Sequence, residues 1–301
     1  MGYQELLFKK LKENGYDLRL APVEKVQELK EEIMTRVERG DIDRALYEKH
    51  MSWFNFSPEE KMTDAKSVII ASIPQSAISV GLHWKGQIGR FLVPPTYSYK
   101  PADGNLIGLI ESVLSPAGFS VVRAPIPEKL LAARTGLAKY GRNNITYIES
   151  IGSYHRLVAL YTDMPCEDYH WGEPQMLEDC EHCLECIESC PTASITQERF
   201  LVKAERCLTY FNESRNPFPS WVDSKWHNAV IGCFKCQTSC PANPKLPVEK
   251  SSIIFSEEEV RQIIDSVPKD QLSEETRDKL DRLCLLVCYH FIGRNLSVLL
   301  S

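Results

Sequence analysis

The spacing of apolar residues predicts alternating helices and strands over the first 165 residues. Leucine and phenylalanine recur at helical spacing within 3–14, and further amphipathic helices are expected at 23–38 and 41–52. The run Ser67–Ile73 is short and rich in β-branched residues, and Pro74 ends it, which is typical of a buried strand. This alternation indicates an α/β layer structure. Later segments continue it, with a helix at 106–114, a strand at 119–122, a helix at 127–134, and strands at 145–148 and 157–162.

Two later regions depart from this pattern. Residues 75–103 contain Gly, Pro and Tyr without a clear period, so we expect a long loop, which in a compact domain is often functional. From 166 to about 247, cysteines, prolines and acidic residues replace the periodic pattern, and helices resume at 257–264 and 275–299. We therefore expect an α+β chain in three parts. These are an α/β domain (1–165), a cysteine-rich domain (166–250) and a C-terminal helical segment (251–301).

Charge and hydropathy narrow the range of partners and locations. The formal net charge of −6 gives no overall attraction for nucleic acid or for an anionic membrane. No stretch approaches twenty apolar residues, and the N-terminal residues lack the charged and apolar regions of a secretion signal. We therefore expect a cytoplasmic protein that does not contact a membrane.

The cysteines point to metal. The chain has 11 cysteines, and most of them lie between Cys180 and Cys240. In a reducing cytoplasm, clustered cysteines indicate metal ligation rather than disulfides. In the bacterial ferredoxin pattern, three closely spaced cysteines hold one 4Fe–4S cluster and the fourth holds the neighbouring cluster. The first motif has that pattern, as Cys180-x2-Cys183-x2-Cys186-x3-Cys190-Pro191.

A second motif completes the ligand count. It reads Cys233-x2-Cys236-x3-Cys240-Pro241 and lacks a nearby first cysteine, a position that Cys207 can fill. Zinc or unligated core cysteines are the alternatives, but zinc sites do not usually end in two Cys-x2-Cys-x3-Cys-Pro runs. The sequence thus predicts a ferredoxin-like domain with two adjacent clusters. The predicted ligands are Cys180, Cys183, Cys186 and Cys240 for cluster one, and Cys207, Cys233, Cys236 and Cys190 for cluster two.

The segment before the cysteines carries a family resemblance. Residues 136–144 read GLAKYGRNN, and Gly152-Ser153-Tyr154 and the cysteine motifs follow. With these blocks, roughly residues 60–245 resemble the epoxyqueuosine reductase family and the related cobalamin-dependent reductive dehalogenases. The resemblance implies a nitroreductase-like, cobalamin-binding α/β domain, in which one cluster reduces the cobalt. It also implies a set of cofactor contacts, namely Gly136, Leu137, Tyr140, Gly141, Arg142 and Asn143. The alternative for this block is an ordinary connecting loop with Gly and Asn in turn positions.

One position departs from the family pattern. In epoxyqueuosine reductases an aspartate before the Gly-Leu block donates a proton, and alignment through Pro125, Glu128 and Gly136 places Val122 there. Valine cannot donate a proton. For each tyrosine considered as a replacement for the acid, the alternative is a buried ring whose hydroxyl only makes a hydrogen bond. The candidate replacements are Tyr97, Tyr99, Tyr154 and His155.

These features favour a cobalamin-dependent iron–sulfur reductase with a small-molecule substrate. We expect a low-potential donor, such as ferredoxin or flavodoxin, to supply its electrons. One alternative is an epoxyqueuosine reductase that acts on tRNA with its acid supplied from elsewhere. Another is an electron-transfer or corrinoid-handling protein without substrate chemistry. The valine at position 122 and the negative net charge count against tRNA.

The ligand assignment predicts a metal content and a pattern of damage. Anaerobically reconstituted protein should contain about eight iron atoms, from two four-iron clusters. Because Cys190 and Cys240 each serve the cluster of the other motif, Cys190→Ala should disturb cluster two and Cys240→Ala cluster one. Iron analysis and electron paramagnetic resonance (EPR) spectra check both expectations. Protein that binds zinc with negligible iron would contradict the assignment.

Overall fold

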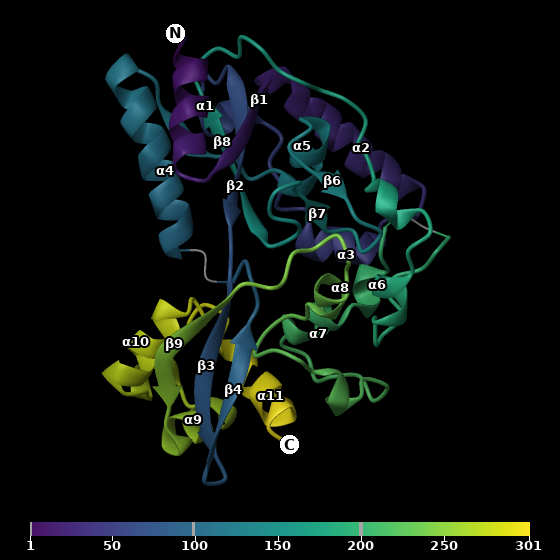
Figure 1. Cartoon of the computed structure of the whole chain (residues 1–301), viewed down its shortest axis with the longest axis vertical. Coiled ribbons are helices and arrows are strands. Elements are labelled where there is room, and N and C mark those ends of the chain that lie inside the picture. Colours follow the sequence, from purple (N-terminus) through teal and green to yellow (C-terminus); the bar gives the residue numbers. More distant parts are fainter. Residues whose placement is uncertain (1, 98–99, 199–200) are drawn as a thin grey trace. The chain divides into compact units, whose positions relative to one another are not determined.

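The computed structural model describes residues 2–97, 100–198 and 201–301. The chain forms two compact units, and each is discontinuous in sequence (Figure 1). Unit 1 comprises residues 1–74 and 101–183, and unit 2 comprises residues 75–100 and 184–301. The three contiguous domains expected from the sequence stay a prediction, because these compact units follow different boundaries. In the described parts of the chain, no helix has the length and apolar character needed to span a membrane.

Unit 1 is built on a four-stranded antiparallel sheet. The strands are β1 (Asp17–Pro22), β2 (Ser67–Pro74), β8 (His155–Thr162) and β5 (Val121–Arg123), in the order β1-β2-β8-β5. Alternate residues of the buried central strand β2 face opposite sides, so the sheet needs cover on both faces. The expected α/β layers are therefore present, although the strands run antiparallel.

Helices cover both faces of this sheet (Figure 1). On one face, α1 (Tyr3–Glu13) and α4 (Lys100–Leu114) pack against residues such as Ile69 and Ala71. On the other face, α2 (Val26–Glu38) and α5 (Glu128–Arg134) pack with Val68 and Ile70. The result is a three-layer sandwich. Unit 1 also contains the short helix α3 (Arg44–His50) and a two-stranded hairpin of β6 (Lys139–Tyr140) and β7 (Thr146–Tyr147).

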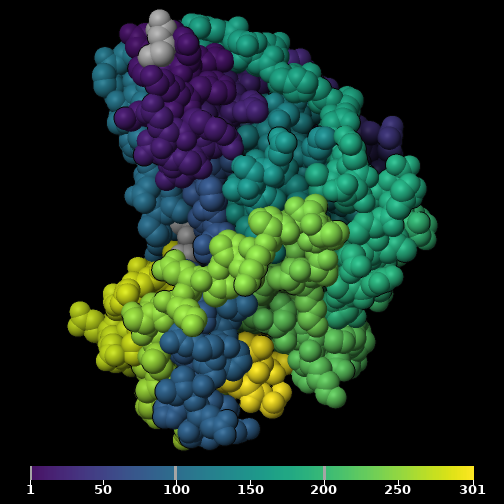
Figure 2. All heavy atoms as spheres, viewed as in Figure 1, coloured from purple at the N-terminus to yellow at the C-terminus, as the bar shows by residue number. Residues whose placement is uncertain are grey.

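Unit 2 combines a small mixed sheet with helices. Strand β3 (Ala77–Trp84) pairs antiparallel with β4 (Gln87–Val93) and parallel with β9 (Val248–Phe255). In Figure 2 the blue spheres of the β3–β4 hairpin accordingly lie against green spheres from the C-terminal half of the chain. Helices α9 (Glu257–Ile264), α10 (Glu274–Arg282) and α11 (Tyr289–Leu299) share a hydrophobic core with this sheet. The cysteine-rich segment adds α6 (Glu185–Glu188), α7 (Leu208–Asn212) and α8 (Lys235–Thr238).

Two expectations about local structure were wrong. Residues 75–103 are not a long loop, because β3 and β4 form a hairpin whose turn residues Lys85 and Gly86 both have positive φ. Such a two-residue turn matches the twist of the flanking strands. The helix expected at 275–299 is broken into α10 and α11, and Cys284 in the break has a φ of 56°. Strands β1 and β9 were not expected from the sequence.

Helical glycines give a stability test of this packing. A Cβ at buried Gly293 in α11 would lie 2.1 Å from the carbonyl oxygen of Ile263 in α9. Gly293→Ala should therefore lower the free energy of unfolding by roughly 1–3 kcal/mol through overpacking. The matched control is Gly108→Ala in α4, where no atom lies within 4 Å of the added Cβ. That variant should gain about 0.5–1 kcal/mol from helix propensity. Thermal unfolding measures both, and equal shifts would contradict the close approach of α9 and α11.

Candidate iron–sulfur and cofactor site

The two cysteine motifs adopt the same local structure. In each motif, the cysteine that comes four residues before the last one lies on a one-turn helix. This is Cys186 on α6 in the first motif and Cys236 on α8 in the second. The residues before the last cysteine of each motif meet, because the hydroxyls of Ser189 and Ser239 lie 2.8 Å apart. The segments 185–190 and 235–240 thus form a pseudo-symmetric pair within unit 2.

The four thiols predicted for cluster two lie near one another in unit 2. Burial raises the pKa of the Cys236 thiol strongly, and the neighbouring thiols of Cys233, Cys207 and Cys190 raise it further. Burial likewise raises the pKa of Cys207, with contributions from Cys233 and Cys190. Thiols crowded in this way gain from sharing a cationic metal cluster, which favours their thiolate forms. The donor set therefore fits a 4Fe–4S cluster.

The ligands predicted for cluster one are divided between the units. Cys180 and Cys183 belong to unit 1, whereas Cys186 and Cys240 belong to unit 2. Within the described ranges 2–97, 100–198 and 201–301, no three His, Cys, Asp or Glu side chains are close enough to share a single metal ion. The assignment of individual cysteines to each cluster stays a prediction.

Two thiols of the cluster-two set, those of Cys190 and Cys233, make hydrogen bonds that the sequence did not reveal. Asn228 Nδ2 donates to Cys233 Sγ at 3.2 Å. The hydroxyls of Ser194 and Thr192 lie 3.2 and 3.6 Å from Cys190 Sγ. Burial raises the pKa of Cys190, but hydrogen bonds from the hydroxyls and the backbone N–H groups of Ser194 and Thr192 outweigh it and lower the pKa overall. The polar residues Thr192 and Ser194 directly after Cys190-Pro191 were the available signal in the sequence.

The residues carried over as cobalamin contacts form the hairpin after α5. Gly136 has a φ of 69° where α5 ends, a conformation that favours glycine. Gly141 lies in the β6–β7 turn, where a Cβ would approach the ring of Tyr147 to 2.5 Å. Asn143 donates to the Tyr147 hydroxyl at 2.9 Å, while Leu137 and Tyr140 are buried. Local packing thus accounts for Gly136, Gly141 and Asn143, and the role of this block as a corrinoid site stays a prediction.

Arg142 connects this hairpin to the first cysteine motif. Its Nη2 donates to the backbone carbonyl of Cys180 at 2.5 Å and lies 3.5 Å from that of Glu181. Both partners belong to unit 1, as the hairpin does. The contact fixes the backbone at the first predicted ligand of cluster one relative to residues 141–145.

The candidate proton donors that the structure describes are divided between the two units. Tyr154 and His155 are buried in unit 1, whereas Tyr97 lies in unit 2, and Tyr99 falls outside the described residues. The Tyr97 hydroxyl donates to the carboxylate of Glu213, and burial together with that carboxylate raises the pKa of Tyr97. A raised pKa makes Tyr97 a weaker acid at neutral pH.

His155 is buried, and both of its ring nitrogens are hydrogen-bonded within unit 1. Its Nδ1 lies 3.0 Å from the Gly152 carbonyl oxygen and therefore carries the proton, while Nε2 accepts from the Thr146 hydroxyl at 3.0 Å. Burial lowers the pKa of His155 to about 4. A neutral imidazole with both nitrogens hydrogen-bonded argues against a role as proton donor.

The side chain at position 122 faces the apolar core. Val122 packs against the cluster that includes Leu137 and Ala138, so it lies on the same side of the sheet as the start of the hairpin block. The next residue, Arg123, pairs instead with buried Asp103 of α4. The Asp103 carboxylate also accepts two hydrogen bonds from Arg156 of β8, from Nε at 2.5 Å and from Nη2 at 2.9 Å. These bonds connect α4 to the sheet. No acidic side chain replaces the aspartate at position 122 itself.

Sequence reasoning also missed a partly buried carboxyl near this strand, on a side chain that is 32% exposed. Glu128 Oε1 accepts from the backbone amide of Ala159 at 3.3 Å and lies 3.5 Å from Arg123. Burial raises the pKa of Glu128 to about 7, although Arg156 and Arg123 oppose the rise. Its backbone contact gives it a structural role at the edge of β8.

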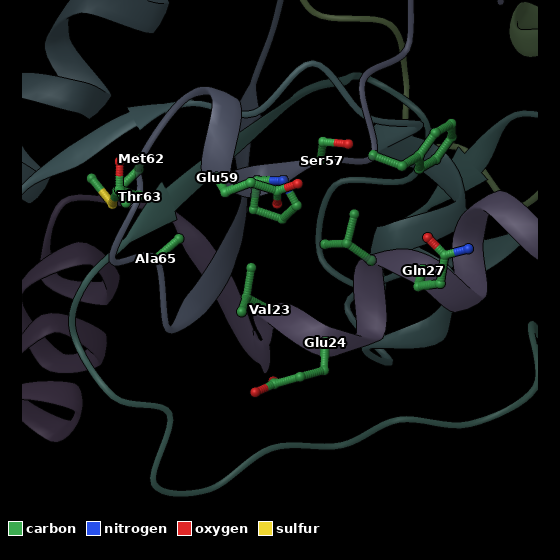
Figure 3. A pocket seen from close by; sticks show the side chains of 11 residues that line it. Val23, Glu24, Gln27, Ser57, Glu59, Met62, Thr63 and Ala65 are labelled. Carbon is green, nitrogen blue, oxygen red and sulfur yellow. The ribbon is translucent and has the colours of Figure 1, made fainter.

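Unit 1 also contains a shallow cavity of about 390 Å³ (Figure 3). Residues 23–27, which lie just before and at the start of α2, and residues from the segment 56–65 line it, including Val23, Glu24, Phe56 and Met62. None of the residues that the sequence assigned to chemistry lines this cavity.

Comparisons with known proteins agree with this arrangement. Residues 179–243 match the model of the 4Fe-4S double cluster binding domain, so this segment binds two 4Fe–4S clusters. An epoxyqueuosine reductase from Cellulophaga algicola is 31% identical over 195 residues, which cover 62% of this chain and 61% of the relative. The chain spans about half the length of the curated relatives that it matches. The resemblance to epoxyqueuosine reductases is therefore confirmed at the level of sequence.

Solved structures show the same fold. A crystal structure of epoxyqueuosine reductase with an epoxyqueuosine-modified tRNA stem loop has a TM-score of 0.71 at 17% identity and covers 99% of this chain and 80% of that one. The enzyme from Bacillus subtilis, with its catalytic aspartate loop swung out of the active site, has a TM-score of 0.66 at 17% identity, with the same coverage. The expected α+β class, with a nitroreductase-like layered unit and an iron–sulfur domain, is confirmed.

The environment of His155 predicts how stability depends on pH. Its folded pKa of about 4 lies below the ordinary value of 6.5, so the stability from neutral His155 is complete above pH 6.5 and falls as the pH drops toward 4. The loss approaches about 1.4 kcal/mol per pH unit in that window. His155→Gln removes this titration. Thermal unfolding of both proteins between pH 7.5 and 5 should show their difference in stability shrinking as the pH falls, and a constant difference would contradict the assignment.

Proposed function

We propose that the chain is a cobalamin-dependent iron–sulfur reductase that acts on epoxyqueuosine in tRNA. The observation that carries the proposal is the double-cluster segment within a chain whose whole length follows the epoxyqueuosine reductase fold. One solved relative contains an epoxyqueuosine-modified tRNA stem loop, which supports tRNA over the small-molecule substrate expected from net charge. A low-potential electron donor such as ferredoxin or flavodoxin and a cytoplasmic location remain predictions.

Electrons would pass through the clusters to the corrinoid. Two adjacent clusters accept one electron at a time, and their ligands lie in a short segment, which favours transfer between them. A bound cobalamin would supply a cobalt centre that, when reduced, acts on the substrate. In this chain the residues proposed to hold it are Arg142, whose guanidinium offers several donors, and the backbone groups of the turn 141–145. Arg142 also holds the backbone at Cys180, so one side chain would connect corrinoid and cluster.

Proton donation is the step for which this chain lacks the residue of its relatives, because Val122 stands where the resemblance implies an aspartate. Reduction of an epoxide needs a proton as electrons arrive, and a positioned acid is worth typically about 10²–10⁴-fold in rate. Val122 cannot supply it. We therefore propose slow turnover, with the proton supplied by water or by another side chain.

A second candidate function follows from the same valine. The chain would then be a reductase of the same architecture that acts on another substrate. Reduction of that substrate would need no proton from position 122, which is consistent with the apolar residue found there. Turnover of epoxyqueuosine-containing tRNA separates the two candidates.

The test is reduction of epoxyqueuosine-containing tRNA by protein loaded with clusters and cobalamin, with a chemical reductant. Binding of hydroxocobalamin, followed by its absorption spectrum, is measured first. The unmodified protein should turn over slowly, and Val122→Asp should raise the rate by about 10²-fold or more. Val122→Asn is the matched control, because it is similar in size and polarity but supplies no acidic proton.

The outcomes distinguish the hypotheses. No turnover by either protein, with cofactors and tRNA bound, would favour the second candidate. Absence of corrinoid binding at tens of micromolar would leave an electron-transfer protein without substrate chemistry. A carboxylate on a partly buried strand costs stability, so unfolding of Val122→Asp is measured beside its activity.

A further inference from the structure

The two cysteine motifs allow a comparison within one chain. Cys183-x2-Cys186-x3-Cys190 corresponds position by position to Cys233-x2-Cys236-x3-Cys240. The equivalent serines before the last cysteines are hydrogen-bonded to each other, and both middle cysteines lie on one-turn helices. Differences between equivalent positions are therefore differences between the two cluster environments.

The first difference follows the last cysteine of each motif. Cys190 Sγ has the Ser194 hydroxyl at 3.2 Å and the Thr192 hydroxyl at 3.6 Å. The positions equivalent to Thr192 and Ser194 in the second motif are Ala242 and Pro244. Neither has a hydroxyl, and proline has no N–H. Cys240 therefore lacks the two hydroxyls that Cys190 has at these positions, and it also lacks the backbone N–H at the position of Ser194.

The second difference precedes the motifs. Asn228, five residues before Cys233, donates from Nδ2 to Cys233 Sγ at 3.2 Å. The same nitrogen donates to the Trp226 carbonyl at 3.1 Å, and Oδ1 accepts from the Phe234 amide at 3.5 Å, so the side-chain amide is held in this orientation. The first motif has no equivalent of Asn228, because only two residues separate Cys180 from Cys183, whereas residues 208–232 lie between Cys207 and Cys233.

Both differences fall on the same cluster if the last cysteines are exchanged. In the exchanged arrangement Cys190 and Cys233 both hold cluster two, whereas Cys240 and Cys183 hold cluster one. Reduction adds negative charge to the cluster and its sulfurs. Hydrogen bonds to those sulfurs stabilise the added charge, so they raise the reduction potential.

We propose that Asn228, Thr192 and Ser194 give cluster two the higher reduction potential of the pair. A single electron that enters the chain therefore rests on cluster two, and cluster one is the more strongly reducing centre. This inference rests on the two clusters and their exchanged ligands, and is independent of the proposed substrate.

The experiment is an EPR-monitored redox titration of the full chain with both clusters reconstituted and no corrinoid added. The unmodified protein should show two midpoint potentials. Ser194→Ala and Asn228→Leu should each lower the higher potential and leave the lower one in place. Thr238→Val is the matched control, because its hydroxyl donates only to the Phe234 and Lys235 carbonyls, and it should shift neither potential.

A gain-of-donor variant tests the same idea in the opposite direction. Ala242→Ser introduces a hydroxyl after Cys240, at the position equivalent to Thr192, and should raise the lower potential toward the higher one. Iron content is measured for every variant, and Ser194→Ala carries the test if Asn228→Leu loses iron. A fall in the lower potential, or no shift with iron retained, would overturn the proposal. Loss of iron from both variants would also overturn it, because these residues would then build the site rather than set its potential.

Discussion

Each short cysteine motif depends on the other, because three closely spaced thiolates cannot complete a cubane cluster and the fourth must come from elsewhere. This requirement connects the two motifs in structure, although about fifty residues separate the last cysteine of one motif from that of the other. Few apolar side chains are buried in this segment, and metal ligation supplies folding energy in such cases. The contact between Ser189 and Ser239 is where this dependence is visible in the polypeptide.

If the ligands are exchanged as predicted, polar residues outside the ligand set also act across the two motifs. Asn228 approaches a sulfur of one motif, and Ser194 approaches a sulfur of the other, yet both act on one cluster if Cys190 is exchanged. On the other side, Arg142 joins the hairpin of unit 1 to the backbone of Cys180. Second-sphere groups of this kind set the energies of electron transfer, whereas the cysteines only set where the electrons are held.

Unit 1 is a well-packed layered fold in which an apolar residue, Val122, stands where the resemblance implies an acid. Its sheet is covered on both faces, and Asp103 with Arg156 fixes α4 to the strands, so the backbone around position 122 is well supported. The relatives' aspartate is replaced there by a valine that packs in the apolar core. Under the proposed function, the fold for reduction would be retained while the proton would come from another group, so measurements at position 122 bear directly on the substrate.

The sequence by itself determined the cluster chemistry and most local elements. Cysteine spacing is set by the geometry of the clusters, and helices such as 257–264 follow from apolar periodicity. Both can therefore be predicted from the sequence alone. Only the tertiary structure decided that 75–100 joins the C-terminal half, because β9 pairs with β3 across more than 150 residues and no local signal marks such a partner. It likewise decided which thiols Asn228 and Ser194 reach and that His155 is hydrogen-bonded on both nitrogens. Those properties depend on which groups folding brings within about 3 Å, and residue type alone does not contain that information.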